Sequence, residues 1–165
     1  MACRGVHFAL DPVDEARVLE ASDDEELMQV IESLETRWDR DWLVQTDKAW
    51  DAIHRTVTDG ELLYDNGEYP LKLMICGGKQ LFLGDGYTVS FISRHGVGEV
   101  AAQTGLMGRD WFRERCYRML RTARDYGGVI GDEDFEYAWQ YFEPLKAFFN
   151  KVGASGLSAI FTVDA

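Results

Sequence analysis

The chain has 165 residues, of which 46% are hydrophobic, and its formal net charge is −12 at pH 7. This length and composition are typical of one folded domain and exclude a disordered chain. The acidic balance argues against nucleic-acid binding, which needs lysine and arginine to displace counterions from phosphate, and against anionic membrane surfaces. It suits a protein that attracts a basic protein partner by long-range electrostatics.

Targeting, metal-binding and cofactor motifs are missing from the sequence. There is no run of about 18 apolar residues and no N-terminal signal peptide, so we expect a cytoplasmic protein without a membrane segment. No CxxC or HExxH motif occurs, so we expect neither a metal site nor a cofactor. The cysteines and histidines are isolated from one another: Cys3, Cys76, Cys116, His7, His54 and His95.

A strand and two helices are predicted in the first 38 residues. Residues 2–10 alternate, with Val6 and Phe8 on one side and His7 on the other, as in a strand. Asp11–Pro12 is typical of a helix start, with Asp as N-cap and Pro at the first helical position. The next helix begins with a capping box in which Ser22 precedes Glu25 by three residues, and it runs to about residue 38. Residues 39–45 are interpreted as a polar linker.

The best-formed motif is the segment Thr46–Thr58, a predicted helix. Thr46 or Asp47 is expected to cap its start, and Gly60 its end. Asp47 or Asp51 would then be placed to hydrogen-bond the His54 imidazole and to raise its pKa. Either His54 is a general acid/base or ligand contact, or it anchors the helix. The candidate functional residues here are Asp47, Lys48, Trp50, Asp51 and His54.

A glycine pair follows the next predicted strand. Residues 71–76 alternate after Pro70 and are expected to be a strand that ends at Gly77–Gly78. This pair could admit a ligand close to the backbone, or it could simply form a tight turn, since no complete phosphate-binding motif follows. Both glycines are therefore candidate functional residues.

The second half of the chain is mostly helical. A strand at 87–92 precedes helices at about 96–106 and 109–124. A further helix starts near Asp132, with a kink or a new segment expected at Pro144, and a last strand is expected at 157–163. This order predicts a single α+β domain over residues 1–165, with several helices packed on a small mixed or antiparallel sheet of about four strands.

Charge is distributed unevenly along the chain. Residues 1–60 hold 15 acidic and 6 basic side chains, whereas residues 109–126 hold 3 acidic side chains and 6 arginines. These segments could face each other, be solvated separately, or join two subunits. The oligomeric state is therefore left open.

A series of short motifs runs along the second part of the chain: Asp47–His54, Tyr69–Leu71, Ile75–Gly78, Val97, Glu99, Val100, Glu136–Tyr137, Tyr141–Phe142, Leu145 and Phe148–Phe149. The order of these motifs resembles the bacterial YfbM-like family of unknown function. The resemblance spans about residues 40–165, and the first 40 residues more loosely. It implies a small α+β domain and no particular activity, and it marks Asp47, Lys48, Trp50, His54 and the glycine pair as positions to test.

Two functions fit these observations. The first is a non-catalytic acidic interaction protein, such as an inhibitor or immunity-type protein for a basic partner, which would bind more weakly at high salt. The alternative is a small enzyme or ligand-binding domain with a site around His54 and Asp47. No nucleophile motif of the GxSxG type supports catalysis, so enzyme activity stays an open question.

Overall fold

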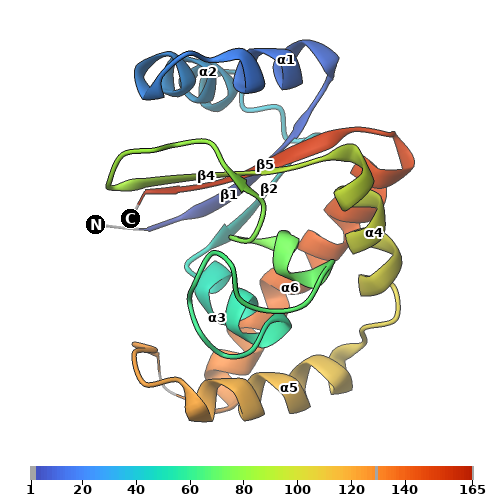
Figure 1. Ribbon diagram of the computed structural model, residues 1–165. Coiled ribbons are helices and arrows are strands. Elements are labelled where there is room, and N and C mark those ends of the chain that lie inside the picture. The colour runs from blue at the N-terminus through green and yellow to red at the C-terminus, as the bar shows by residue number, and fades with distance from the viewer. Residues whose placement is uncertain (1–2, 129, 165) are drawn as a thin grey trace.

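One antiparallel sheet forms the centre of the computed structural model, which describes residues 3–128 and 130–164 (Figure 1). The strand order is β2-β1-β5-β4-β3, and every neighbouring pair is antiparallel. The expected α+β domain with a small sheet is confirmed, with five strands in place of about four. Their bounds are β1 Gly5–Leu10, β2 Leu43–Asp47, β3 Lys79–Gln80, β4 Tyr87–Ile92 and β5 Ser158–Asp164.

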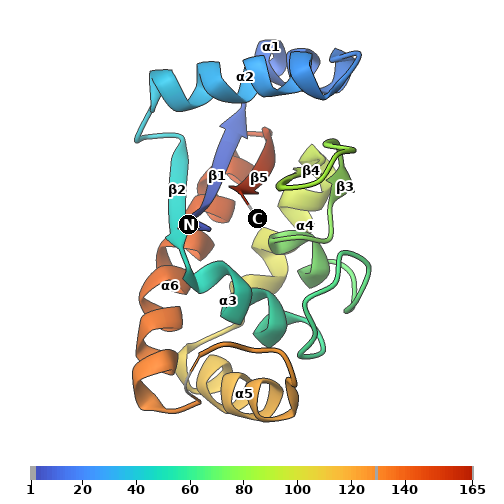
Figure 2. The same ribbon diagram turned by 90° about the vertical axis from the view of Figure 1, so that its left-hand side faces the viewer.

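Helices cover both faces of the sheet. Figures 1 and 2 show α1 and α2 on one face and α3, α4 and α6 on the other, with α5 packed farther out. In the described part of the chain, no helix is long and apolar enough to cross a membrane. The bounds are α1 Pro12–Glu20, α2 Asp24–Arg37, α3 Ala49–Val57, α4 Arg94–Thr104, α5 Arg109–Thr122 and α6 Asp132–Ala154.

The alternation in β1 divides the interior into two cores. Phe8 and Leu10 pack with the buried stripe of α2, including Ile31. On the other face, His7 lies against the aromatic rings of Phe148 and Phe161. The predicted two-sided pattern of the first strand is therefore confirmed, and both sides of this strand are buried because helices cover each face.

The predicted linker at residues 39–45 is partly a strand. Its second half belongs to β2, which continues to Asp47 and pairs with β1. Asp47 has a φ of 45°, a left-handed conformation that Asp tolerates better than most residues, and the chain there turns directly into α3. Neither Thr46 nor Asp47 caps this helix: Lys48 holds the N-cap position without a side-chain hydrogen bond. Thr46 instead donates its hydroxyl to the Gly5 carbonyl.

The capping box of α2 is shifted by one residue from its predicted place. Asp23 is the N-cap and accepts a hydrogen bond from the Glu26 amide at 2.8 Å. The Glu26 carboxylate in turn accepts from the amide and hydroxyl of Ser22. Several capping residues are adjacent in this stretch, so the sequence signal alone does not select the register.

The predicted strand at residues 71–76 is wrong. Leu71–Met74 form a short 3-10 helix, η1. Met74, Ile75 and Cys76 are all buried in succession, which a half-buried strand does not allow, so the alternation of Leu71, Leu73 and Ile75 was misleading. The strand in this region is the two-residue β3, which starts after the glycine pair.

Helix α6 runs through Pro144 as one helix, so of the two expected outcomes the new segment is wrong, whereas the kink stays a prediction. Pro144 removes one backbone hydrogen bond, which by itself disfavours a helix. The helix buries an apolar face on both sides of this residue, including Phe142, Leu145 and Phe149, and tertiary packing of this kind outweighs local propensity.

The arginine-rich α5 does not face the acidic N-terminal helices. Figure 1 shows α1 and α2 at one end of the molecule and α5 at the other. The cations of α5 are instead balanced by the first turns of α6, where Arg113 pairs with Asp132 at 2.9 Å and Arg109 pairs with Glu136. Arg115 donates to the carbonyls of Thr56 and Thr58. The acidic helices α1 and α2 are therefore not neutralised by α5, although Arg37 pairs with Asp14 and Arg94 pairs with Glu15 at their own end of the molecule.

Candidate functional site

The motif on α3 forms internal contacts. Trp50 is half-buried and donates its indole N–H to the Cys3 carbonyl at 2.9 Å. Asp51 accepts a hydrogen bond from Arg55 at 2.5 Å, and Arg55 also donates to Asp125 at 2.8 Å. The side chain of Arg55 is only 1% exposed, so the i,i+4 pair of Asp51 and Arg55 neutralises a buried guanidinium and is not a surface ion pair.

His54 is fully buried and holds a loop. Its Nε2–H lies 2.9 Å from the Leu63 carbonyl and 3.0 Å from Asn66 Oδ1, and both of these atoms only accept hydrogen bonds. The predicted contact with Asp47 or Asp51 is wrong. Burial lowers the pKa of His54, contrary to the expected increase, so the imidazole is held neutral.

Asn66 extends this anchor through the turn that follows α3. Its side-chain amide donates to the hydroxyl of Thr58, to Asp59 and to the Glu61 carbonyl. Asn66 is itself buried. His54 and Asn66 therefore fix residues 58–67 against the helix, which is a structural role for the most conspicuous histidine of the sequence.

Asp47 and Lys48 lie apart from this network. Asp47 accepts a hydrogen bond from the Tyr137 hydroxyl at 2.9 Å and lies 3.3 Å from Arg4 Nε. Burial and the contact with Asp47 raise the pKa of Tyr137 to about 12. Lys48 is exposed at the start of α3. Asp47 and His54 thus share no partner and do not form an acid/base pair.

The glycine pair leaves no room for a ligand. A Cβ at Gly77 would lie 2.1 Å from the Lys72 carbonyl oxygen, and one at Gly78 would lie 2.3 Å from the Phe91 carbonyl oxygen. Gly77 also donates its N–H to that Lys72 carbonyl at 2.9 Å. The glycines are therefore needed for close packing of one backbone on another, and the ligand-approach interpretation is not supported by this geometry.

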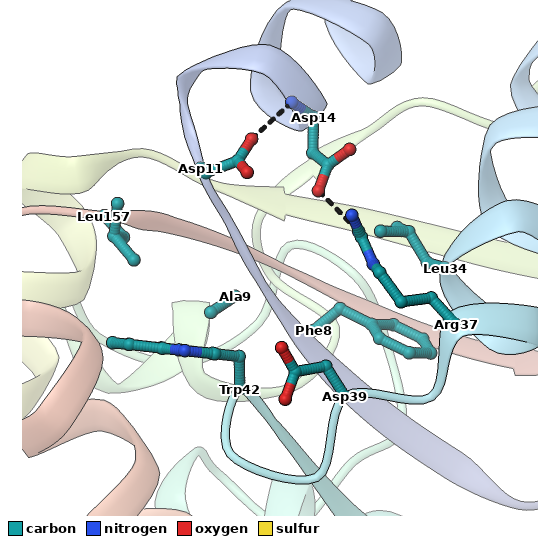
Figure 3. A pocket seen from close by; sticks show the side chains of 9 residues that line it. All are labelled: Phe8, Ala9, Asp11, Asp14, Leu34, Arg37, Asp39, Trp42 and Leu157. Atoms are coloured by element: carbon teal, nitrogen blue, oxygen red, sulfur yellow. Dashed lines mark hydrogen bonds and ion pairs between the residues drawn. The ribbon is translucent and has the colours of Figure 1, made fainter.

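A pocket of about 310 Å³ lies where β1 ends and α1 begins (Figure 3). We call it the acidic pocket. None of the residues singled out from the sequence lines it. Apolar residues of the wall come from the end of β1, from α2 and from the residue before β5. Polar groups come from the start of α1, from the end of α2 and from the segment that joins α2 to β2. The lining residues are Phe8, Ala9, Asp11, Asp14, Leu34, Arg37, Asp39, Trp42 and Leu157.

The carboxylates of the acidic pocket differ in their surroundings. Asp14 is buried and accepts hydrogen bonds from Arg37 at 2.6 Å and Arg17 at 3.4 Å. Asp11 is exposed and caps α1 by accepting the Asp14 amide. Asp39 is exposed and accepts only the Asp41 amide at 3.1 Å. Asp11 and Asp39 therefore keep oxygen atoms free to bind a cation.

Trp42 forms the aromatic wall of the acidic pocket. Figure 3 shows its ring across the pocket from Asp11 and Asp14. The backbone of Trp42 is held against β1, because the Ala9 amide donates to the Trp42 carbonyl at 2.9 Å. Lys151 of α6 lies 4.3 Å from the ring centroid. In the sequence, this pocket is indicated only by a tryptophan, Trp42, within a predicted polar linker. One such residue does not predict which other residues, remote in sequence, lie beside it in the fold.

Titratable side chains of the acidic pocket are carboxylates and one arginine. Within residues 3–128 and 130–164, no three His, Cys, Asp or Glu side chains are grouped in a way that could hold a metal ion. Among the described residues that line the acidic pocket, Asp11, Asp14 and Asp39 lie beside Arg37, and the lining includes no histidine, cysteine, serine or threonine.

Comparison with known proteins agrees with this fold. The crystal structure of YfbM from Escherichia coli, described as a protein of unknown function, matches with a TM-score of 0.72 and 17% sequence identity, over 97% of this chain and 99% of that chain. At this identity the likeness shows the fold alone. A search of curated proteins finds no match. A family model described as "Domain of unknown function (DUF1877)" matches residues 1–162. The resemblance to YfbM-like proteins is confirmed, and the chain belongs to the DUF1877 family.

Proposed function

We propose that the protein is a non-catalytic binding protein that receives a basic side chain of a protein partner in the acidic pocket. The observation that carries this proposal is the composition of the pocket. Its lining has three carboxylates, one indole ring and a single arginine around a space of about 310 Å³. Such a space is large enough for the end of an arginine or lysine side chain and lies near the lower limit of small-molecule sites.

The charge balance favours a cation over an anion. Among the residues that line the pocket, Asp11, Asp14 and Asp39 outnumber Arg37, whose guanidinium is already engaged by Asp14. Two further cations, Arg17 and Lys151, contact lining residues but do not line the pocket. Since Arg17 and Arg37 both act on Asp14, the carboxylates that remain for a partner are those of Asp11 and Asp39.

The aromatic wall favours the same ligand. A cation is attracted to the face of an indole ring by the ring quadrupole. One such contact is already present within the protein, where the ammonium group of Lys151 lies 4.3 Å from the centroid of the Trp42 ring. A partner cation in the acidic pocket would combine this attraction with hydrogen bonds to Asp39, and both contributions are larger for a planar guanidinium than for an ammonium.

The test uses single-residue probes of known charge. N-acetyl-arginine methylamide is titrated into the protein, and the indole N–H signal of Trp42 is followed by NMR. We expect saturable shifts that weaken several-fold when NaCl is raised from about 50 mM to about 500 mM. The citrulline analogue has the same shape without the charge, so it serves as the matched ligand and should bind much more weakly.

Matched variants separate the pocket from the general negative charge. Asp39→Asn should weaken binding of the arginine probe, because it removes an unpaired carboxylate from the pocket. Glu32→Gln removes an exposed charge of α2 that does not line the pocket, and it should leave binding almost unchanged. Equal binding of arginine and citrulline, or equal effects of the two variants, would contradict the proposal.

A further inference from the structure

A second, smaller cavity lies near the opposite end of β5. Its volume is about 170 Å³, and we call it the apolar cavity. It is bounded by α3, by the loop that follows this helix and by strands β4 and β5. Thr88 and Val163 face each other in the register of these strands. The lining residues are Trp50, Leu62, Leu63, Tyr64, Cys76, Thr88 and Val163.

The motif on α3 builds the wall of this cavity. Trp50 lines it directly, with its indole N–H already used by the Cys3 carbonyl. His54 holds the Leu63 carbonyl at 2.9 Å, and Leu63 and Tyr64 form the rim. These two rim side chains are 49% and 54% exposed, although both are large and hydrophobic. The loop that the buried histidine fixes is therefore the loop that separates the cavity from solvent.

The walls carry no charge. Burial raises the pKa of the Cys76 thiol to about 12, so this group is a neutral, weakly polar wall at physiological pH. The polar groups that remain are the hydroxyls of Tyr64 and Thr88, which lie 3.2 Å apart. A charged ligand would lose its hydration without gaining a counter-ion, whereas a neutral ligand with one hydroxyl could join the Tyr64–Thr88 pair.

We propose that the apolar cavity binds a neutral molecule of one aromatic ring with at most one hydroxyl group, the size and polarity of phenol. A dry apolar cavity of about 150 Å³ is sufficient for benzene in another protein, and the present cavity is slightly larger. The indole of Trp50 and the ring of Tyr64 provide aromatic surfaces that favour a flat ring over a branched chain. This site is independent of the acidic pocket and shares no lining residue with it.

Phenol is the probe, and benzoate is its charged counterpart. With side-chain methyl groups labelled, phenol should shift the NMR signals of Leu62 and Val163 saturably, with a dissociation constant of about a millimolar or less, as fits a ligand of this size. Benzoate should bind at least about tenfold more weakly because its charge is not compensated. The phenol shifts should be insensitive to salt and to Asp39→Asn, which distinguishes this site from the acidic pocket.

Two variants test the location. Tyr64→Ala removes a rim ring and should weaken phenol binding by about tenfold, whereas Tyr69→Ala removes an equally exposed ring of the same loop that does not line the cavity. Cys76→Met should fill the cavity and abolish binding. If Cys76→Met fails to fold, the tyrosine pair still decides. No saturable shift up to about 20 mM phenol, or equal losses in both tyrosine variants, would overturn the proposal.

Discussion

The two ends of strand β5 lie beside cavities of opposite character. The acidic pocket lies beside Ala9 and Leu157, where β1 ends and β5 begins, and the apolar cavity lies beside Val163, near the other end of β5. In the acidic pocket, polar groups from a helix cap and a loop remain available to solvent. Around the apolar cavity, Trp50 and His54 of the α3 motif already form hydrogen bonds within the protein.

This difference shows that the residues most noticeable in the sequence are not those whose polar groups remain free to bind a ligand. His54 and Asp51 stand out in the sequence because they are chemically versatile, yet each is committed to a structural partner. Asp39 lies in an unremarkable polar stretch, and its carboxylate remains exposed beside an aromatic ring. Chemically versatile side chains in a motif can therefore form a binding site only where burial and internal hydrogen bonds leave their polar groups without a partner.

The largest effect is expected at the backbone contact next to the apolar cavity. Gly77→Ala would place a methyl group 2.1 Å from the Lys72 carbonyl oxygen, so the backbone must move, at a cost of about 3 kcal/mol or more in unfolding free energy. Gly98→Ala is the matched control on α4, where a Cβ meets no atom within 4 Å, and it should stabilise the helix by about 0.5–1 kcal/mol. Urea denaturation measures both. A well-folded Gly77→Ala variant of normal stability would show that this region is loosely packed.

The next effect is a dependence of stability on pH, and it arises on the face covered by α3–α6. Burial lowers the pKa of His7 from 6.5 to about 4. The unfolded chain therefore takes up this proton first, and the free energy of unfolding should fall by about 3 kcal/mol as pH drops from about 6.5 to about 4. His54 adds a change in the same direction. Denaturation of the wild type and of His7→Gln between pH 7 and pH 4 checks this, and parallel curves for the two proteins would contradict it.

A smaller effect should distinguish the carboxylates within the acidic pocket. Asp14→Asn removes the buried partner of Arg17 and Arg37 and should cost about 1–2 kcal/mol of unfolding free energy. Asp39→Asn should leave stability close to that of the wild type, because the side chain is exposed and accepts a single backbone hydrogen bond. Thermal unfolding of both variants compares them. If Asp39→Asn were the more destabilised protein, Asp39 would be structural rather than available to a partner.

The smallest effect is expected at the rim of the apolar cavity. Tyr64→Phe keeps the ring and removes the hydroxyl that lies 3.2 Å from Thr88, which should cost about 0.5 kcal/mol. Amide hydrogen exchange in residues 61–66 should be only slightly faster than in the wild type. The control is His54→Ala, which removes the anchor of the same loop and should accelerate exchange far more. Equal acceleration in both variants would indicate that the tyrosine, not the histidine, holds the loop.

Local sequence patterns were sufficient for most elements and for the α+β class. The cap of α1, the approximate extent of α2 and the alternation of β1 depend on neighbouring residues, so they can be predicted without the rest of the chain. Trp50, Asp51 and His54 were also correctly placed on a helix, with Gly60 close behind its end, whereas Asp47 belongs to β2 and Lys48 is the N-cap. The errors are β2, η1 and the new segment that was one of two outcomes expected at Pro144, where packing against distant elements outweighed local preference.

The roles of individual side chains were decided by tertiary structure. The sequence by itself determined the negative charge, the fold class and the family resemblance, because these depend on composition and on local order. Only the folded chain decided that His54 meets Asn66 rather than a carboxylate, and that Asp11, Asp39 and Trp42 line one pocket. Burial and hydrogen-bond pairing depend on residues that are remote in sequence, and they determine which polar groups are left to bind a partner.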